Sequence, residues 1–335
     1  MPAEALAHFV DDKGAVIRAL GTGLINRTYL VESGAGRFVL QWVNPIFDPA
    51  IHHNIEAVTK RLVARGVSTP ELVRTRAGEL WATVGGSVWR LMTFIDGVSF
   101  DMLSSAAQAR AAGELLGRFH RALEDLEHPF VALRNIHDTP RHLEALRDAI
   151  AAHADRRLHA EVARLGERVA ASAAKLPALP PLLPRVCHGD LKISNVLFDQ
   201  NERAICLIDL DTVGPMHLGH ELGDAWRSWC NPALEDDPAP RFDVDLFGAS
   251  LDGYRDGLKR ALDSDERAAL LHGVEWIALE LAARFAADAL RDRYFGWDAN
   301  RYDSRPDHNL ARARSQLALH EAIVATRPAR ATALR

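Results

Sequence analysis

Residues 188–195 of this chain read His188-Gly189-Asp190-Leu191-Lys192-Ile193-Ser194-Asn195. The stretch is polar and contains a glycine, as loops often do, and it runs into the short apolar segment 196–198. A second apolar segment, 204–210, carries Asp209 near its end. We expect the two segments to pair as a hairpin, because a short polar turn joins them. That pairing would bring Asp209 beside Asn195 and leave Asp190 across a small gap.

These groups suit phosphoryl transfer from ATP to a hydroxyl. A carboxylate must orient the hydroxyl and accept its proton, and Asp190 fits that role. A carboxylate and an amide oxygen must hold Mg²⁺, and Asp209 and Asn195 fit that role. Lys192, on the same loop, can offset negative charge in the transition state. The alternative is that Asp190 and Asn195 simply cap a turn, but the whole string followed by Asp209 favours catalysis.

The N-terminal part alternates strand-like segments with turns. The strand-like segments are 15–20, 28–32, 37–43, 79–84 and 87–95. Gly85-Gly86 separates the last two, which is typical of a hairpin. Segment 51–65 has apolar residues at helical spacing. We therefore expect residues 1–95 to form a small lobe built from a sheet and one helix.

The rest of the chain, residues 96–335, is predicted to form a larger and mainly helical lobe. The helical segments are 106–126, 141–175 (as two helices), 244–262, 265–290 and 308–325. A proline-rich stretch at 177–184 ends the second group and leads into the central loop. The arginine-rich end, 327–335, is expected to be a frayed tail. The fold class is thus α+β with two lobes.

The amino-acid composition limits the kinds of binding partner to expect. Hydrophobic residues make up 48% and charged residues 25%, which is ordinary for a globular protein. The formal net charge of −5 gives no reason to expect nucleic acid or an anionic membrane as a partner. We find neither a signal peptide nor an apolar run long enough to cross a bilayer. We expect a cytoplasmic protein whose partner is a small molecule with a hydroxyl group, and the oligomeric state stays open.

The central motif, together with Leu207-Ile208-Asp209-Leu210-Asp211, resembles the aminoglycoside phosphotransferase and choline kinase family, distant relatives of protein kinases. The likeness covers almost the whole chain. Residues 21–29 resemble the family's nucleotide loop, and residues 89–97 resemble its last small-lobe strand and hinge. The resemblance implies a two-lobed protein-kinase-like fold and ATP and Mg²⁺ as cofactors. It also implies that Asp190 is the catalytic base and that Asn195 and Asp209 are the metal ligands.

The same resemblance implies a set of nucleotide-binding residues in the small lobe and hinge. They are Gly21, Thr22, Gly23, Asn26, Gln41, Met92 and Phe94. Glycines let backbone N–H groups approach phosphates closely. Asn26 stands where protein kinases have a third glycine, and Gly-x-Gly alone usually marks a plain turn.

The clearest departure from the family lies on the third strand. Protein kinases and many family members have a lysine there that pairs with phosphates and with a helix glutamate. In this chain the position is Gln41, and Glu56 on the following helix is the natural partner without a cation. Lys192 or Arg37 are candidates for compensation. A catalytically weak member stays an open alternative.

Within the family, residues 208–213, 222–227 and 308–317 look most like the N-acetylhexosamine 1-kinase branch. Such enzymes, by resemblance, phosphorylate the anomeric hydroxyl of N-acetylated sugars. The likeness implies that Asp211 and Arg227 contact the substrate, with Asp190. Asp211 is equally compatible with a structural role.

Other acceptors and one other class remain. An aminoglycoside, a choline-like alcohol or homoserine are alternatives, and Asp236, Asp237, Asp243 and Asp245 supply the acidity that an aminoglycoside would need. A nucleotide-binding regulator without turnover is suggested by Gln41. The complete set of Asp190, Asn195 and Asp209 argues against it.

Overall fold

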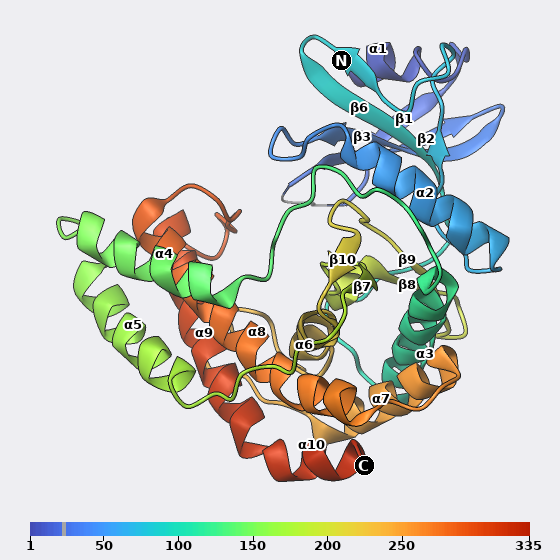
Figure 1. The fold of residues 1–335 in the computed structure, drawn as a ribbon. Helices are drawn as coiled ribbons and strands as arrows, with labels where there is room; N and C mark the ends of the chain where they lie inside the picture. The colour runs from blue at the N-terminus through green and yellow to red at the C-terminus, as the bar shows by residue number, and fades with distance from the viewer. Residues whose placement is uncertain (22–24) are drawn as a thin grey trace.

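The computed structural model describes residues 1–21 and 25–335 and has two lobes (Figure 1). An antiparallel sheet forms the N-terminal lobe, and helices form most of the C-terminal lobe. The two-lobed α+β fold predicted from the sequence is confirmed. Among the described residues, every helix is too short or too polar to cross a bilayer.

The N-terminal lobe is built on one twisted sheet. Its strands are β1 (Val16–Ala19), β2 (Arg27–Ser33), β3 (Gly36–Val43), β4 (Leu72–Val73), β5 (Ala82–Val84) and β6 (Ser87–Thr93). The order is β1-β2-β3-β6-β4, with β5 paired to β6. Gly85 and Gly86 join β5 to β6 with φ of 56° and 77°, as a two-residue hairpin turn needs. Helices α1 (Pro2–Leu6) and α2 (Ile51–Ala64) complete the lobe.

The two faces of this sheet have different tasks. Leu40 of β3 lies opposite Leu91 of β6, and both are buried in a core with Leu6 of α1. Successive residues of a strand point to opposite faces. Gln41 and Arg90, the next pair along β3 and β6, therefore lie on the other face. That face looks toward the C-terminal lobe, where Arg90 makes an ion pair.

The C-terminal lobe packs around one long helix. Its helices are α3 (Ala106–Leu123), α4 (Thr139–Ala152), α5 (His159–Ala173), α6 (Leu218–Trp229), α7 (Val244–Leu258), α8 (Ser264–Arg291), α9 (Arg305–Ala325) and α10 (Arg327–Ala333). Helix α8 contacts α4, α5, α6 and α9 (Figure 1). The periodic segments of the sequence are thus helices, with boundaries shifted by a few residues.

The arginine-rich C-terminus is not a frayed tail, so that expectation is wrong. Residues 327–333 form helix α10, and Arg330 is fully buried. Arg330 and Arg327 both pair with Glu275 of α8, at 2.5 and 2.8 Å. A buried carboxylate with two guanidinium partners pins the end of the chain to the lobe.

Candidate active site

Two short antiparallel strand pairs hold the central loop, and only the second of them is a hairpin. Strand β7 (Arg185–Cys187) pairs with β10 (Gly214–Met216), and β8 (Val196–Phe198) pairs with β9 (Ala204–Leu207). The segment 188–195 therefore runs from β7 to β8, and the segment 208–213 runs from β9 back to β10, between the same two strand pairs. The backbone N–H of Ile208 donates to the carbonyl of Asn195 at 2.9 Å. The structure thus brings Asp209 next to Asn195, as the hairpin pattern predicted.

Asp190 is the centre of the loop's polar contacts. Its Oδ2 accepts hydrogen bonds from Lys192 Nζ at 2.7 Å and from the Asn195 amide at 3.2 Å. Burial raises the pKa of Asp190, but the charge and hydrogen bond of Lys192 outweigh it, so the net pKa is lowered. Asp190 is therefore ionised at neutral pH. The Asn195 amide N–H also donates to the Asp190 carbonyl at 2.8 Å. Both of these contacts with Asp190 use the amide nitrogen of Asn195 and not its oxygen.

The carboxyl group of Asp209 lies where its ionised form is disfavoured. Burial and the nearby charge of Asp211 raise the pKa of Asp209 to about 6, although Lys192 acts in the opposite direction. A raised carboxyl pKa means that the surroundings supply too little positive charge for the ionised form. Carboxylate and amide oxygens are ligands that Mg²⁺ prefers. The donor set of Asp209 and Asn195 therefore fits a bound Mg²⁺.

Helix α6 supports the loop from behind, through residues that sequence reasoning did not select. Glu221 is fully buried and accepts the backbone N–H groups of His188 and Gly189, at 2.7 and 3.0 Å. Burial raises the pKa of Glu221, but its hydrogen bond with His120 and its other partners lower it overall. Glu221 thus stays ionised inside the lobe. The signal in the sequence was a run of polar residues at helical spacing, including Asp224, on a face that is otherwise apolar.

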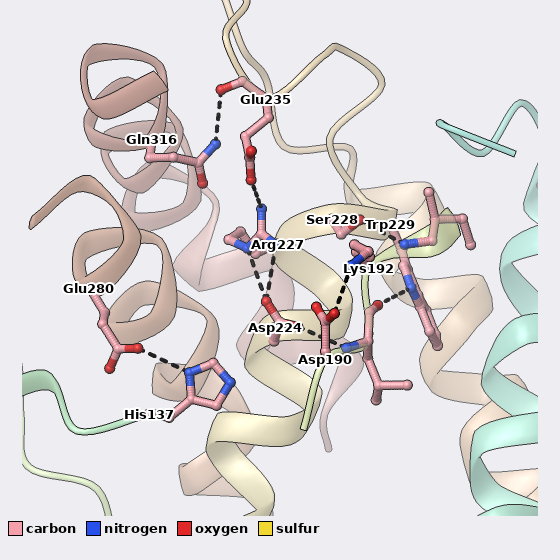
Figure 2. Close-up of polar contacts among 12 residues, drawn as sticks. His137, Asp190, Lys192, Asp224, Arg227, Ser228, Trp229, Glu235, Glu280 and Gln316 are labelled. Atoms are coloured by element: carbon pink, nitrogen blue, oxygen red, sulfur yellow. Dashed lines mark hydrogen bonds and ion pairs between the residues drawn. The ribbon is translucent and has the colours of Figure 1, made fainter. Parts of the chain in front are cut away.

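Asp224 and Arg227 connect the loop to Glu235 (Figure 2). Asp224 Oδ2 accepts the backbone N–H of Leu191 at 2.9 Å, and its Oδ1 accepts two hydrogen bonds from Arg227, at 3.0 and 3.2 Å. Figure 2 shows Asp190 beside Asp224. Arg227, which was predicted to contact substrate, is buried but lies in the same polar cluster as the predicted base.

Further polar side chains gather around this cluster. Glu235 pairs with Arg227 at 3.4 Å and with Arg312 of α9 at 3.5 Å. Gln316, also on α9, donates to the Glu235 carbonyl at 3.3 Å. The segment 308–317 quoted from the sequence therefore reaches the site.

His137 flanks the cluster on its other side (Figure 2). Its Nδ1 lies 3.0 Å from the buried carboxylate of Glu280. Burial lowers the pKa of His137, but the hydrogen bond and charge of Glu280 outweigh it and raise the pKa overall. Nothing in the motifs pointed to His137, because it lies on an irregular segment before α4.

The nucleotide loop is described only in part. Thr22 and Gly23 lie outside the described residues, and Gly21 has φ of 70°. Asn26 donates to Asp211 Oδ2 at 2.7 Å and accepts the backbone N–H of Asn44 at 2.9 Å. Asn26 thus links the start of β2 to the C-terminal lobe.

Gln41 and Asp211 both contact Arg90. Gln41 Oε1 accepts from Arg90 Nε at 2.8 Å, and Gln41 Nε2 donates to Thr28 at 3.0 Å. Asp211 forms a buried ion pair with Arg90. Both oxygens of Asp211 therefore have partners, since Asn26 binds the other one. This arrangement agrees with the structural reading of Asp211.

The hinge follows β6. Met92 lies on the same face of β6 as Arg90, and Phe94 follows the end of the strand. The Arg37 guanidinium lies 4.6 Å from the Phe94 ring centre and pairs with Asp96 at 2.9 Å. Arg37 is therefore held at the exposed hinge.

Glu56 of α2, the expected partner of a cation on β3, pairs with Lys60 and Arg74 and not with any group on β3.

Comparison with known proteins places the chain among phosphotransferases. The model of the family described as "Phosphotransferase enzyme family" matches residues 16–269. The chain is 27% identical over 280 residues to a homoserine kinase of Rhodopseudomonas palustris (strain BisA53), covering 80% of this chain and 79% of that one. It is 26% identical over 276 residues to a homoserine kinase of Zymomonas mobilis subsp. mobilis (strain ATCC 31821 / ZM4 / CP4), covering 80% and 81%.

Solved structures share the fold at lower identity. A microcompartment-associated aminopropanol kinase aligns with a TM-score of 0.66 and 21% identity, over 97% of each chain. An amicoumacin kinase, solved in complex with AMP-PNP, Ca²⁺ and Ami, aligns with a TM-score of 0.63 and 15% identity, over 90% of this chain and 87% of that one. At these identities the likeness is one of fold.

Proposed function

This chain belongs to the phosphotransferase enzyme family and is a small-molecule kinase; we propose that it uses ATP and Mg²⁺ to phosphorylate a hydroxyl group with Asp190 as the base. The observation that carries the proposal is the convergence of Asp190, Asn195 and Asp209 between two antiparallel strand pairs. Phosphoryl transfer depends mainly on positioning and on electrostatic stabilisation, and these groups supply both. The complete set argues against a regulator without turnover.

Each residue has a distinct task in this reaction. Asp190, held ionised by Lys192, orients the acceptor hydroxyl and takes its proton as the phosphoryl group transfers. Asn195 and Asp209 would hold Mg²⁺, which would neutralise charge on the phosphates. Lys192 has its pKa raised by Asp190 and Asp209 despite burial, so it stays charged and offsets charge beside the base.

For the acceptor we propose a sugar, with the anomeric hydroxyl of an N-acetylhexosamine as the first candidate. The support is the sequence likeness at 208–213, 222–227 and 308–317 and the polar groups beside Asp190. Arg227, Gln316 and His137 offer hydrogen bond donors, and Glu235 offers acceptors. Mixed donors and acceptors suit a molecule with several hydroxyl groups.

A hydroxy amino acid such as homoserine is the second candidate. The curated relatives named above are homoserine kinases. Arg227 and Arg312 both point to Glu235, and a guanidinium group pairs well with a substrate carboxylate.

An aminoglycoside has less support, because two of its four acidic candidates, Asp236 and Asp243, already have partners. Asp236 pairs with Arg301 and His308 and accepts from Tyr302. Asp243 caps α7 through the backbone N–H groups of residues 245 and 246. Asp236 is thus paired within the protein, and Asp243 is occupied as a helix cap. A choline-like alcohol has no specific observation in its favour.

The test is ADP release with Mg²⁺ and ATP across sugars, hydroxy amino acids, amino alcohols and aminoglycosides. Asp190→Asn is expected to lower turnover roughly 10²–10⁴-fold while ATP still binds. Asp155→Asn, an exposed carboxylate between α4 and α5, serves as the control and should keep full turnover. Near-wild-type turnover in Asp190→Asn would contradict the assignment of the base.

A further inference from the structure

The small lobe lacks the usual phosphate-pairing lysine on β3, yet a cation lies on the neighbouring strand. Gln41 of β3 is directly opposite Arg90 of β6 and opposite Thr28 of β2. The three side chains form a hydrogen-bonded row across the sheet, at 3.0 Å and 2.8 Å. Residues opposite one another in adjacent strands project from the same face. Arg90 therefore reaches the space that a lysine at position 41 would reach.

The guanidinium group of Arg90 is buried and fixed by two neighbouring side chains. Its side chain is 1% exposed, and that of its ion-pair partner Asp211 is 2% exposed. A charge this deeply buried is costly unless it is paired. Arg90 uses Nε for Gln41 and Nη1 for Asp211. Within residues 1–21 and 25–335, Nη2 donates to no protein group, so part of the planar donor set is left for a ligand.

The position of Asp211 ties this guanidinium to the catalytic centre. Asp211 follows Asp209, the proposed metal ligand, by two residues, and its other oxygen is held by Asn26 at the end of the nucleotide loop. Arg90 thus lies between the nucleotide loop and the metal site. A phosphate chain that runs from that loop to the metal would pass this guanidinium.

The other cations near the cleft have different partners. Lys192 binds Asp190, and Arg37 is on the hinge with Asp96. In protein kinases a glutamate on the helix after β3 orients the lysine. The corresponding residue here, Glu56, pairs with Lys60 and Arg74. The lysine–glutamate pair of protein kinases is therefore absent here, because position 41 is glutamine and Glu56 has other partners.

We propose that Arg90 is the residue that pairs with the phosphates of the nucleotide, with Gln41 and Asp211 as its positioning residues. In this chain the cation lies on β6, whereas protein kinases have it on β3. The carboxylate that orients it is Asp211, after Asp209, whereas protein kinases use a glutamate on the helix that corresponds to α2. Arginine suits this task because its planar guanidinium carries several donors, so Nε and Nη1 can bind the positioning residues while Nη2 donates to a phosphate oxygen. The inference rests on the proposed function, since it requires a nucleoside triphosphate between the lobes.

Binding of ATP and of adenosine separates this role from a structural one. Both are measured by calorimetry on the full chain with Mg²⁺, for the wild type, Arg90→Met and Arg90→Lys. Arg90→Met is expected to weaken ATP binding roughly 10–100-fold, the value of a charge-assisted hydrogen bond or two. Adenosine binding should stay unchanged, because adenosine has no phosphates. The exposed Arg18→Met serves as the surface control and should alter neither.

The double variant Gln41→Lys/Arg90→Met returns a cation to β3 and is expected to recover most of the ATP affinity. An equal loss of ATP and adenosine affinity in Arg90→Met, or no loss of ATP affinity, would overturn the assignment. If Arg90→Met does not fold, the same comparison applies to Arg90→Lys, which keeps the charge and loses the fork. A wild-type protein that binds adenosine and ATP equally would overturn this inference alone, whereas one with no ATP-dependent turnover on any acceptor would contradict the proposed function.

Discussion

Asp209 combines two unusual features in one residue. Its backbone φ is 68°, in the left-handed region that few residues other than glycine, asparagine and aspartate adopt. Burial and the charge of Asp211 raise its carboxyl pKa to about 6. Such strain persists where the surroundings over-determine a conformation, and it gathers at functional sites. Both features fit the proposed role of Asp209 as a metal ligand.

Another carboxylate, Glu275 of α8, is fully buried and paired, and it predicts a pH dependence of stability. Burial raises its pKa, but hydrogen bonds from His272, Arg327 and Arg330 outweigh that and lower it to about 2 from the ordinary 4.5. The folded pKa lies below the unfolded one, so the stabilisation is complete above pH 4.5 and is lost as the pH falls toward 2. Glu275→Gln is expected to destabilise the protein by about 3–5 kcal/mol at pH 7, because two arginines lose their partner.

Thermal unfolding of wild type and variant between pH 7 and pH 2 tests this. The difference in Tm should be largest near neutral pH and shrink below pH 4.5. Glu321→Gln removes an exposed ion pair with Arg168 and should cost less than about 1 kcal/mol. A Tm difference for Glu275→Gln that does not change with pH would contradict the prediction.

At the scale of elements, helix α6 is both a core helix and a support for the site. Glu221, Asp224 and Ser228 each accept a backbone N–H group of segment 188–193, and Trp229 donates to the carbonyl of Leu191. These residues recur at helical spacing, so they share one face of the helix. The loop geometry is therefore set by a rigid element rather than by the loop itself.

The crossing of α3 and α7 yields a prediction about packing. A Cβ atom on Gly253 of α7 would lie 2.0 Å from the carbonyl oxygen of Arg110 on α3. Gly253→Ala must therefore push the helices apart, and we expect a loss of roughly 1–3 kcal/mol. Gly248→Ala on the same helix meets nothing within 4 Å and should gain about 0.5–1 kcal/mol from lower backbone entropy in the unfolded chain. Chemical denaturation of both variants checks the opposite signs; a stabilised Gly253→Ala would refute the tight crossing.

At the scale of the whole molecule, contacts beyond the hinge hold the lobes together. Arg90 of the sheet pairs with Asp211 of the large lobe. Asn54 of α2 binds both backbone groups of Val131, on the segment between α3 and α4, at 2.8 and 3.1 Å. That segment leads to His137, which flanks the polar cluster beside Asp190. The position of the small lobe is thus coupled to that cluster.

Replacement of Asn54 tests this coupling. Asn54→Ala removes the hydrogen-bond partners of the N–H and carbonyl of Val131, and the loss of these two bonds should cost about 1–3 kcal/mol. Hydrogen exchange at the Val131 amide is expected to rise about tenfold or more, as local opening becomes easier. His53→Ala, exposed on the same helix, is the control and should leave exchange unchanged. Unaltered protection of Val131 in Asn54→Ala would show that the segment is held by other contacts.

Local patterns were enough to predict most helices, the small sheet and the neighbours Asp190, Asn195 and Asp209. The reason is that a helix depends on contacts three or four residues apart, and the hairpin β8–β9 closes within a few residues. The C-terminal helix was missed, because its stability comes from Glu275 on α8 and not from its own sequence.

The loop 188–195 is the part of the site that the sequence determined by itself, since its residue types and the following hairpin were sufficient. Only the tertiary structure decided what stands behind that loop and what replaces the β3 lysine. Glu221 meets His188 because α6 packs against the loop. Arg90 meets Gln41 and Asp211 through the pairing of β3 with β6 and the closure of the two lobes. These partners are far apart along the chain, and strand register and lobe packing, which join them, leave no local pattern.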